Sequence, residues 1–120
     1  MEFHEFYFVF LRKINDFTFP DDSTKKESFK GHFEFQRQEM LSKRLLFSGP
    51  LDGTGGLYFF STQNMTVNDL MSHLQKDPLV KIGLFVPEVH KSYVPSFMIQ
   101  VKNPDTKIIN DFFSEVINSY

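Results

Sequence analysis

The stretch SGPLDGTGGLYFF, residues 48–60, decides how the middle of the chain folds, because it places four glycines, one proline and one aspartate between two apolar runs. Asp52-Gly53 is a favoured pair for a tight hairpin, and Gly55-Gly56 can adopt positive φ at little steric cost. Pro50 fixes its own φ and favours an extended conformation at the residue before it. We therefore predict two strands joined by this loop, in which Asp52 is either a turn residue or a chemical group.

The first half of the chain predicts a strand followed by a helix. Residues 6–11 form a short aromatic and β-branched run, which is typical of a strand. Thr24 and Glu27 then form a capping box that begins a helix. The apolar stripe of this helix is spaced by three and four residues and contains Phe29, Phe33, Gln36, Met40 and Leu41. The hairpin strands follow, over residues 44–48 and 57–61.

The second half predicts another helix, a strand and a terminal helix. Thr66 and Asp69 form a capping signal for a helix that ends at Asp77-Pro78. A fourth strand is expected over residues 82–94, where Pro87 suits a sheet edge or a bulge. Apolar residues at helical spacing near residues 108–117 indicate an additional C-terminal helix. The order β-α-β-β-α-β predicts an α+β, ferredoxin-like fold with an antiparallel sheet.

The predicted strands carry apolar side chains on both faces. In residues 6–11 one face holds three phenylalanines and the other holds Tyr7, Val9 and Leu11, and residues 57–60 repeat the pattern. A sheet covered by helices on one face should instead alternate apolar and polar residues. The second face therefore needs a cover, which is another subunit's sheet, the terminal helix or a ligand. A second subunit is the most economical cover, so we predict a homodimer through the sheet face.

Length and composition exclude several classes of protein. The chain has 120 residues, a formal net charge of −2 and no cysteine. We expect one domain over residues 1–120, with no nucleic-acid partner and no membrane association. Because no secretory signal is recognisable, we expect a cytoplasmic location. The glycine loop lacks the Lys-Ser/Thr of a phosphate loop, and His4 with His90 lacks a third ligand, so we predict no cofactor and no metal.

Three motifs together resemble the YCII-related family of the dimeric α+β barrel superfamily, which has relatives such as muconolactone isomerase. They are Ser48-Gly49-Pro50-Leu51-Asp52, Gly55-Gly56, and residues 77–84 (DPLVKIGL). The resemblance covers residues 5 to about 93, and the extension over about residues 95–120 lies outside it. It implies that two sheets face each other across a dimer to form a barrel. One departure is Ser42-Lys43, where the family usually has a glycine before the second strand.

The resemblance also implies a His–Asp active site, here His32 and Asp52. We predict Ser48, Gly49 and Pro50 as substrate-binding residues, and the alternative for Ser48 is an ordinary strand serine. Histidine titrates near neutrality, and a carboxylate can fix its tautomer, so His32 suits general acid or base chemistry. The alternative for His32 is a partly buried histidine bonded to a backbone carbonyl. Asp77 precedes Pro78 and is interpreted as a helix-terminating residue.

Three functions remain open from the sequence. The first is a cofactor-independent lyase or isomerase that uses the His–Asp pair on an unknown small organic molecule. The second is a dimer that binds a small hydrophobic molecule without catalysis. The third is an RNA-recognition domain, which shares the β-α-β-β-α-β order and has aromatic residues on its third strand, as residues 57–60 have here. The net negative charge and the absence of a Lys/Arg-Gly signature disfavour the third.

Overall fold

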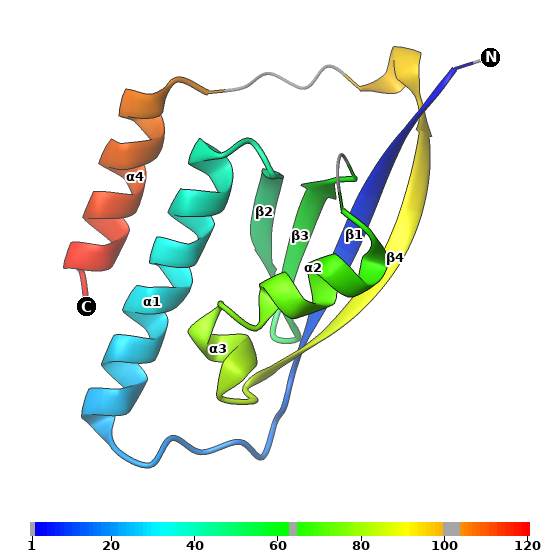
Figure 1. The fold of residues 1–120 in the computed structure, drawn as a ribbon. Helices are drawn as coiled ribbons and strands as arrows, with labels where there is room; N and C mark the ends of the chain where they lie inside the picture. Colours follow the sequence, from blue (N-terminus) through cyan, green and yellow to red (C-terminus); the bar gives the residue numbers. More distant parts are fainter. Residues whose placement is uncertain (1, 63–64, 100–103) are drawn as a thin grey trace.

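The chain folds into one antiparallel sheet accompanied by helices (Figure 1). The computed structural model describes residues 2–62, 65–99 and 104–120. The sheet has the order β2-β3-β1-β4, with strands β1 (Phe3–Lys13), β2 (Leu45–Leu51), β3 (Gly55–Ser61) and β4 (Phe85–Pro95). The helices are α1 (Asp22–Leu41), α2 (Val67–Leu74), α3 (Pro78–Lys81) and α4 (Thr106–Asn118), with a 3₁₀ turn η1 (Ser96–Met98). This α+β arrangement is compatible with the predicted ferredoxin-like fold.

The glycine-rich hairpin forms as predicted, with β2 and β3 antiparallel and Leu51 opposite Gly55. Gly53 in the turn has φ 69°, and Gly55 has φ 131°. A Cβ at Gly55 would lie 1.8 Å from the carbonyl oxygen of Leu11. Only glycine therefore lets β3 begin this close to β1. Gly56 differs from the prediction, because it does not adopt positive φ.

The two faces of the sheet have different neighbours. Tyr7, Val9 and Leu11 are buried in the core with residues of β3 and of α1, α2 and α3, and Figure 1 shows α2 and α3 on one side of the sheet. The alternate residues point to the opposite face. We call this the open sheet face, and it comprises Phe6, Phe8, Phe10, Phe47 and Phe59.

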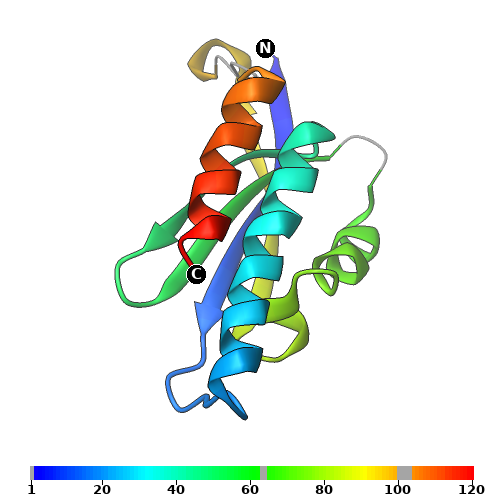
Figure 2. The same ribbon diagram turned by 90° about the vertical axis from the view of Figure 1, so that its left-hand side faces the viewer.

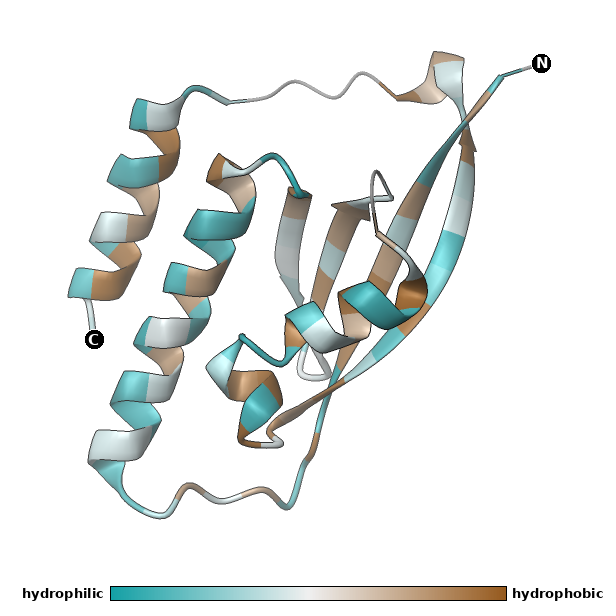
Figure 3. Cartoon of the chain, in the orientation of Figure 1, coloured by the Kyte–Doolittle hydropathy of each residue, from teal (hydrophilic) through white to brown (hydrophobic). Residues whose placement is uncertain are grey.

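The open sheet face is aromatic, and Figure 3 shows hydrophobic residues along β1 and β3, the strands that contribute most of it. Phe47 stacks on Phe59 with ring centroids 4.4 Å apart, and Phe8 meets Phe59 edge-on at 5.4 Å. The phenylalanines of this face show ring contacts only with one another and with His4 in the part of the chain that the structure describes. Phe47 is 48% exposed.

The C-terminal helix α4 packs along α1, and Figures 1 and 2 show the two helices side by side. Ile109 and Phe113 are buried in this contact, and Arg37 of α1 donates a hydrogen bond from Nη1 to Ser114 Oγ at 3.5 Å. The predicted C-terminal helix is therefore confirmed, and it docks on α1 of its own chain. In the described residues no helix is both long and apolar enough to cross a bilayer.

Helix α1 differs from the prediction at its start and in the face that it buries. Asp21 is the N-cap, and its carboxylate accepts a hydrogen bond from the backbone N–H of Thr24, so Thr24 is not the cap. The buried residues are Ser28, His32, Phe35 and Glu39. The residues of the predicted apolar stripe are only partly buried and lie next to these four positions. The most buried face was missed because three of its four positions are polar and give no apolar signal.

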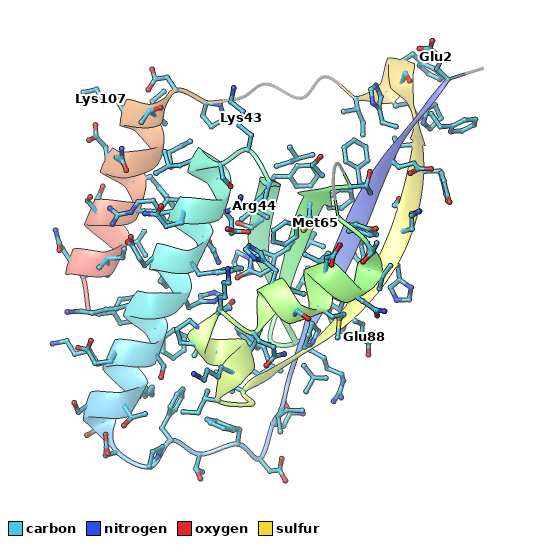
Figure 4. The ribbon with its side chains drawn as sticks, in the orientation of Figure 1. Glu2, Lys43, Arg44, Met65, Glu88 and Lys107 are labelled. Carbon is cyan, nitrogen blue, oxygen red and sulfur yellow. The ribbon has the colours of Figure 1, made fainter. Side chains whose placement is uncertain are left out.

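The buried Glu39 joins α1 to the sheet and to α2. Its carboxylate accepts hydrogen bonds from Arg44 Nε at 3.1 Å and Arg44 Nη2 at 2.8 Å, and it also contacts His73 Nε2. Figure 4 shows Arg44 between the end of α1 and β2. Lys43 precedes it with φ 64°, in the left-handed region that favours glycine. The carboxylate side chain is 3% exposed, so the pairing with Arg44 is what makes its burial tolerable.

The remaining boundaries follow the predicted signals in part, because α2 ends at Leu74, and Asp77-Pro78 begins the short helix α3 instead of ending α2. The Thr66 capping box begins α2, with both reciprocal hydrogen bonds to Asp69 present. β4 begins at Phe85 rather than at residue 82, because residues 78–81 form the short helix α3. β4 lies at the edge of the sheet and pairs with β1, so the prediction that Pro87 lies in an edge strand is confirmed.

Candidate functional site

The candidate site lies where α1 meets the beginning of α3. Gly31 of α1 makes this meeting possible, since a Cβ at that position would lie 2.6 Å from Cγ of Pro78. The close approach places the next residue, His32, against Asp77, the N-cap of α3. His32 is 7% exposed and Asp77 is fully buried. Two helices distant in sequence thus bring an imidazole and a carboxylate together inside the protein.

Three donors converge on the carboxylate of Asp77. The ring nitrogen Nδ1 of His32 lies 2.8 Å from Oδ2 and 2.9 Å from Oδ1. The hydroxyl of Tyr58 donates to Oδ2 at 2.8 Å, and the backbone N–H of Leu79 donates to Oδ1 at 3.0 Å. Hydrogen-bond donors of this kind compensate a buried carboxylate for the hydration that it loses. Asp77 therefore orients His32 and caps α3 at the same time.

The second ring nitrogen of His32 meets an amide. Gln36, one turn along α1, donates from Nε2 to His32 Nε2 at 3.0 Å, and its Oε1 accepts from Ser48 Oγ at 3.4 Å. With the amide oriented this way, His32 carries its proton on Nδ1 and presents a basic Nε2. The chain Asp77–His32–Gln36–Ser48 is therefore continuous from the buried carboxylate to β2.

Tyr58 is a permanent donor in this network. Burial, and secondly the charge of Asp77, hold the pKa of Tyr58 well above its ordinary value. Its hydroxyl therefore stays protonated throughout the neutral range and continues to donate to Asp77. Tyr58 comes from β3 and is 1% exposed. It fixes the carboxylate and does not act as a base.

The raised pKa of Tyr58 predicts a loss of stability in alkali. Unfolded tyrosine titrates near 10.0, and above that pH the unfolded state releases a proton that the folded state keeps. The free energy of unfolding should then fall by up to about 1.4 kcal/mol per pH unit through this residue. Tyr58→Phe lacks this titrating group. The difference in the free energy of unfolding between the wild type and this variant should therefore shrink between about pH 10 and pH 11. Urea unfolding across this range measures both proteins, and parallel curves would contradict the assignment.

A cavity of about 410 Å³ opens beside the network. Its polar lining consists of His32, Gln36, Ser48 and Tyr58, and the rest is apolar side chains and glycines. Gly49 and Pro50, which are predicted to bind substrate together with Ser48, also line it. This volume is within the usual range of ligand pockets, roughly 300–1,000 Å³.

The chain matches no known family model and no curated protein. The resemblance to the YCII-related family accordingly stays a prediction. What is known of the site comes from its geometry.

In the structure, the carboxylate that contacts His32 is that of Asp77, not that of the predicted Asp52. Asp52 lies exposed in the β2–β3 turn and is not among the residues that line the cavity. The partner of His32 is Asp77, for which the sequence predicts only a helix-terminating role. Asp52 is the turn residue that the Asp-Gly signal alone predicts.

Three residues of the network were not identified as site residues from the sequence, namely Gln36, Tyr58 and Asp77. The signal that could have found Asp77 is its position at the start of the motif at residues 77–84. The two histidines considered for a metal are separated along the sheet, since His90 is opposite Phe8 and His4 is opposite Val94. No group of three potential metal-ligating side chains occurs in the described residues.

Proposed function

We propose that this protein is a cofactor-independent enzyme that moves a proton on a small, carbonyl-bearing molecule bound in the cavity, in a lyase- or isomerase-like step. The observation that carries the proposal is the buried Asp77–His32 pair at 2.8 Å, because its basic nitrogen belongs to a residue that lines the cavity. A buried carboxylate behind an imidazole fixes its tautomer and stabilises the imidazolium that forms when it accepts a proton.

Gln36 can exchange its hydrogen bond to His32 for one to a substrate. In the free site its amide N–H occupies His32 Nε2 at 3.0 Å. A substrate carbonyl oxygen can accept that N–H instead, which frees Nε2 to remove a proton from the adjacent carbon. The amide N–H and the Ser48 hydroxyl then face the oxygen on which negative charge develops. Return of the proton from the imidazolium to a different carbon completes an isomerisation with no net gain or loss of protons.

We further propose that two copies associate through the open sheet face, as the predicted dimeric barrel requires. Support comes from the stacked rings of Phe47 and Phe59 and from the 48% exposure of Phe47. A contiguous aromatic face of this kind is uncommon on a monomer and typical of an interface. The helices and the cavity lie away from this interface in the proposed dimer.

A non-catalytic ligand-binding protein is the second candidate function. The observation that favours it is that His32, Gln36 and Ser48 already satisfy one another in the free protein. In such a protein the network would hold the shape of the cavity, and Nε2 of His32 would never receive a proton from the ligand.

Deuterium exchange distinguishes the two functions even while the substrate is unidentified. The protein is incubated in D₂O with a library of small ketones, lactones and enols, and mass spectrometry then identifies each compound that gains deuterium on carbon. The proposed enzyme should label at least one compound, because proton abstraction and return exchange with solvent. Compounds that bind, detected by NMR line broadening, but gain no deuterium would favour the binding protein. A library without any binder would contradict both.

A further inference from the structure

The lining of the cavity points to the charge class of its ligand, an inference that rests on the proposed function. None of the described residues that line it is Lys, Arg, Asp or Glu. One buried formal charge lies directly behind the lining, the carboxylate of Asp77 at 2.8 Å from the His32 ring. A carboxylate or phosphate entering the cavity would therefore find no lysine or arginine in its lining to pair with and would be repelled by Asp77.

The polar side chains of the cavity form one cluster. Gln36 contacts His32 at 3.0 Å and both Ser48 Oγ and Tyr58 OH at 3.4 Å. One hydrogen-bonding group on the ligand can reach this cluster, while a second polar group elsewhere would be left without a partner. An ammonium group would also lack a partner, because both oxygens of Asp77 already accept hydrogen bonds from His32, Tyr58 and Leu79.

The remaining lining is apolar and partly aromatic, and α4 contributes only apolar side chains. Those from α4 are Ile108, Ile109, Phe112 and Phe113. An apolar cavity of about 150 Å³ accommodates benzene, and the volume here is about 410 Å³. The space therefore suits a molecule of roughly two or three fused rings.

We infer that the ligand is an uncharged, ring-containing molecule with a single carbonyl or hydroxyl group, and that α4 forms the wall that selects its apolar part. The helix lies outside the part of the chain that resembles the YCII-related family, so this selectivity is a property of the extension.

Matched naphthalene derivatives test the inference by isothermal titration calorimetry at about pH 7, where naphthol is neutral, naphthoate is an anion and naphthylmethylammonium is a cation. We expect naphthol to bind at least about 100-fold more tightly than either ion, because a charge without a partner is costly in an apolar site. Equal or tighter binding of either ion would overturn the inference.

A substitution on α4 provides the complementary test. Ile108 lines the cavity yet is 59% exposed, so Ile108→Lys can place an ammonium at the rim without unfolding the protein. Naphthoate should then bind at least about tenfold more tightly, while naphthol changes little. Asn118→Lys adds the same charge to α4 outside the cavity and should leave both affinities unchanged.

The two proposals fail in different ways. If naphthol does not bind while the compound library described above yields a labelled compound, the ligand class is wrong and the proposed enzyme stands. If the library yields no labelled compound while naphthol binds with the expected preference, the catalytic proposal is wrong and the ligand class stands. An unchanged naphthoate affinity in Ile108→Lys would contradict the assignment of α4 as a cavity wall.

Discussion

Phe59→Asp is expected to convert the protein from a dimer to a folded monomer. In the proposed dimer the ring of Phe59 is buried among Phe6, Phe8 and Phe47, at centroid distances of 4.4–6.0 Å within one subunit. A carboxylate at that position would be desolvated without a partner, at a cost of several kcal/mol. Twofold symmetry places the substitution twice in one interface, so the dissociation constant should rise by at least about 10³-fold.

A second variant and a control separate dissociation from unfolding. Sedimentation velocity at micromolar concentration gives the mass, and circular dichroism reports the fold. Phe47→Asp is the second variant, because Phe47 is 48% exposed on the monomer and its replacement leaves the core intact. The control is Asn68→Asp, which adds the same charge on the exposed surface of α2.

A monomeric wild type would contradict the dimer proposal. A monomer that binds single-stranded RNA through this face would instead favour the RNA-recognition alternative, in which aromatic rings on the central strands stack with bases.

The strands and the hairpin were predictable from the sequence because their signals are local. The continuous aromatic and β-branched runs in β1 and β3 and the Asp-Gly turn each involve residues that are neighbours in the chain. The sequence left open which side of β1 faces the helices, since both sides are apolar. The structure assigns Val9 to the helix side and Phe8 to the open sheet face. A charge at Val9 or Tyr58 would consequently unfold the subunit rather than separate two subunits.

The site was only half predictable for the same physical reason. His32 could be selected because imidazole chemistry and its place in a helix are local properties. Its partner is 45 residues away, and the contact depends on Gly31 admitting Pro78, a close approach that no sequence pattern encodes. Asp77 also has a complete local explanation as the cap of α3. The sequence interpretation of Asp77 as a helix-terminating residue therefore missed both of its roles, the N-cap of α3 and the partner of His32.

His32→Ala is expected to reduce the rate of deuterium incorporation into the labelled compound by about 10²–10⁴-fold, the usual contribution of a positioned acid or base. The protein should remain folded, because the alanine still suits the middle of α1. Binding of the compound should change much less than the rate does. An exchange rate within about threefold of the wild type would contradict the role of His32 as the proton carrier.

Asp77→Asn tests the positioning of His32 separately from the cap of α3. Asparagine is as good an N-cap as aspartate, so it can still accept the Leu79 N–H bond that is 3.0 Å long here. It carries no charge to fix the Nδ1–H tautomer or to stabilise the imidazolium, and loss of that function can lower a rate by up to about 10⁴-fold. The ¹⁵N shifts of the His32 ring should report a changed tautomer equilibrium, which a purely structural role for Asp77 would not produce. The matched control is Asp52→Asn in the exposed β2–β3 turn, which should leave both the exchange rate and the ring shifts unchanged. If Asp52→Asn slowed exchange and Asp77→Asn did not, the His32–Asp52 pair that the family resemblance implies would be the functional one.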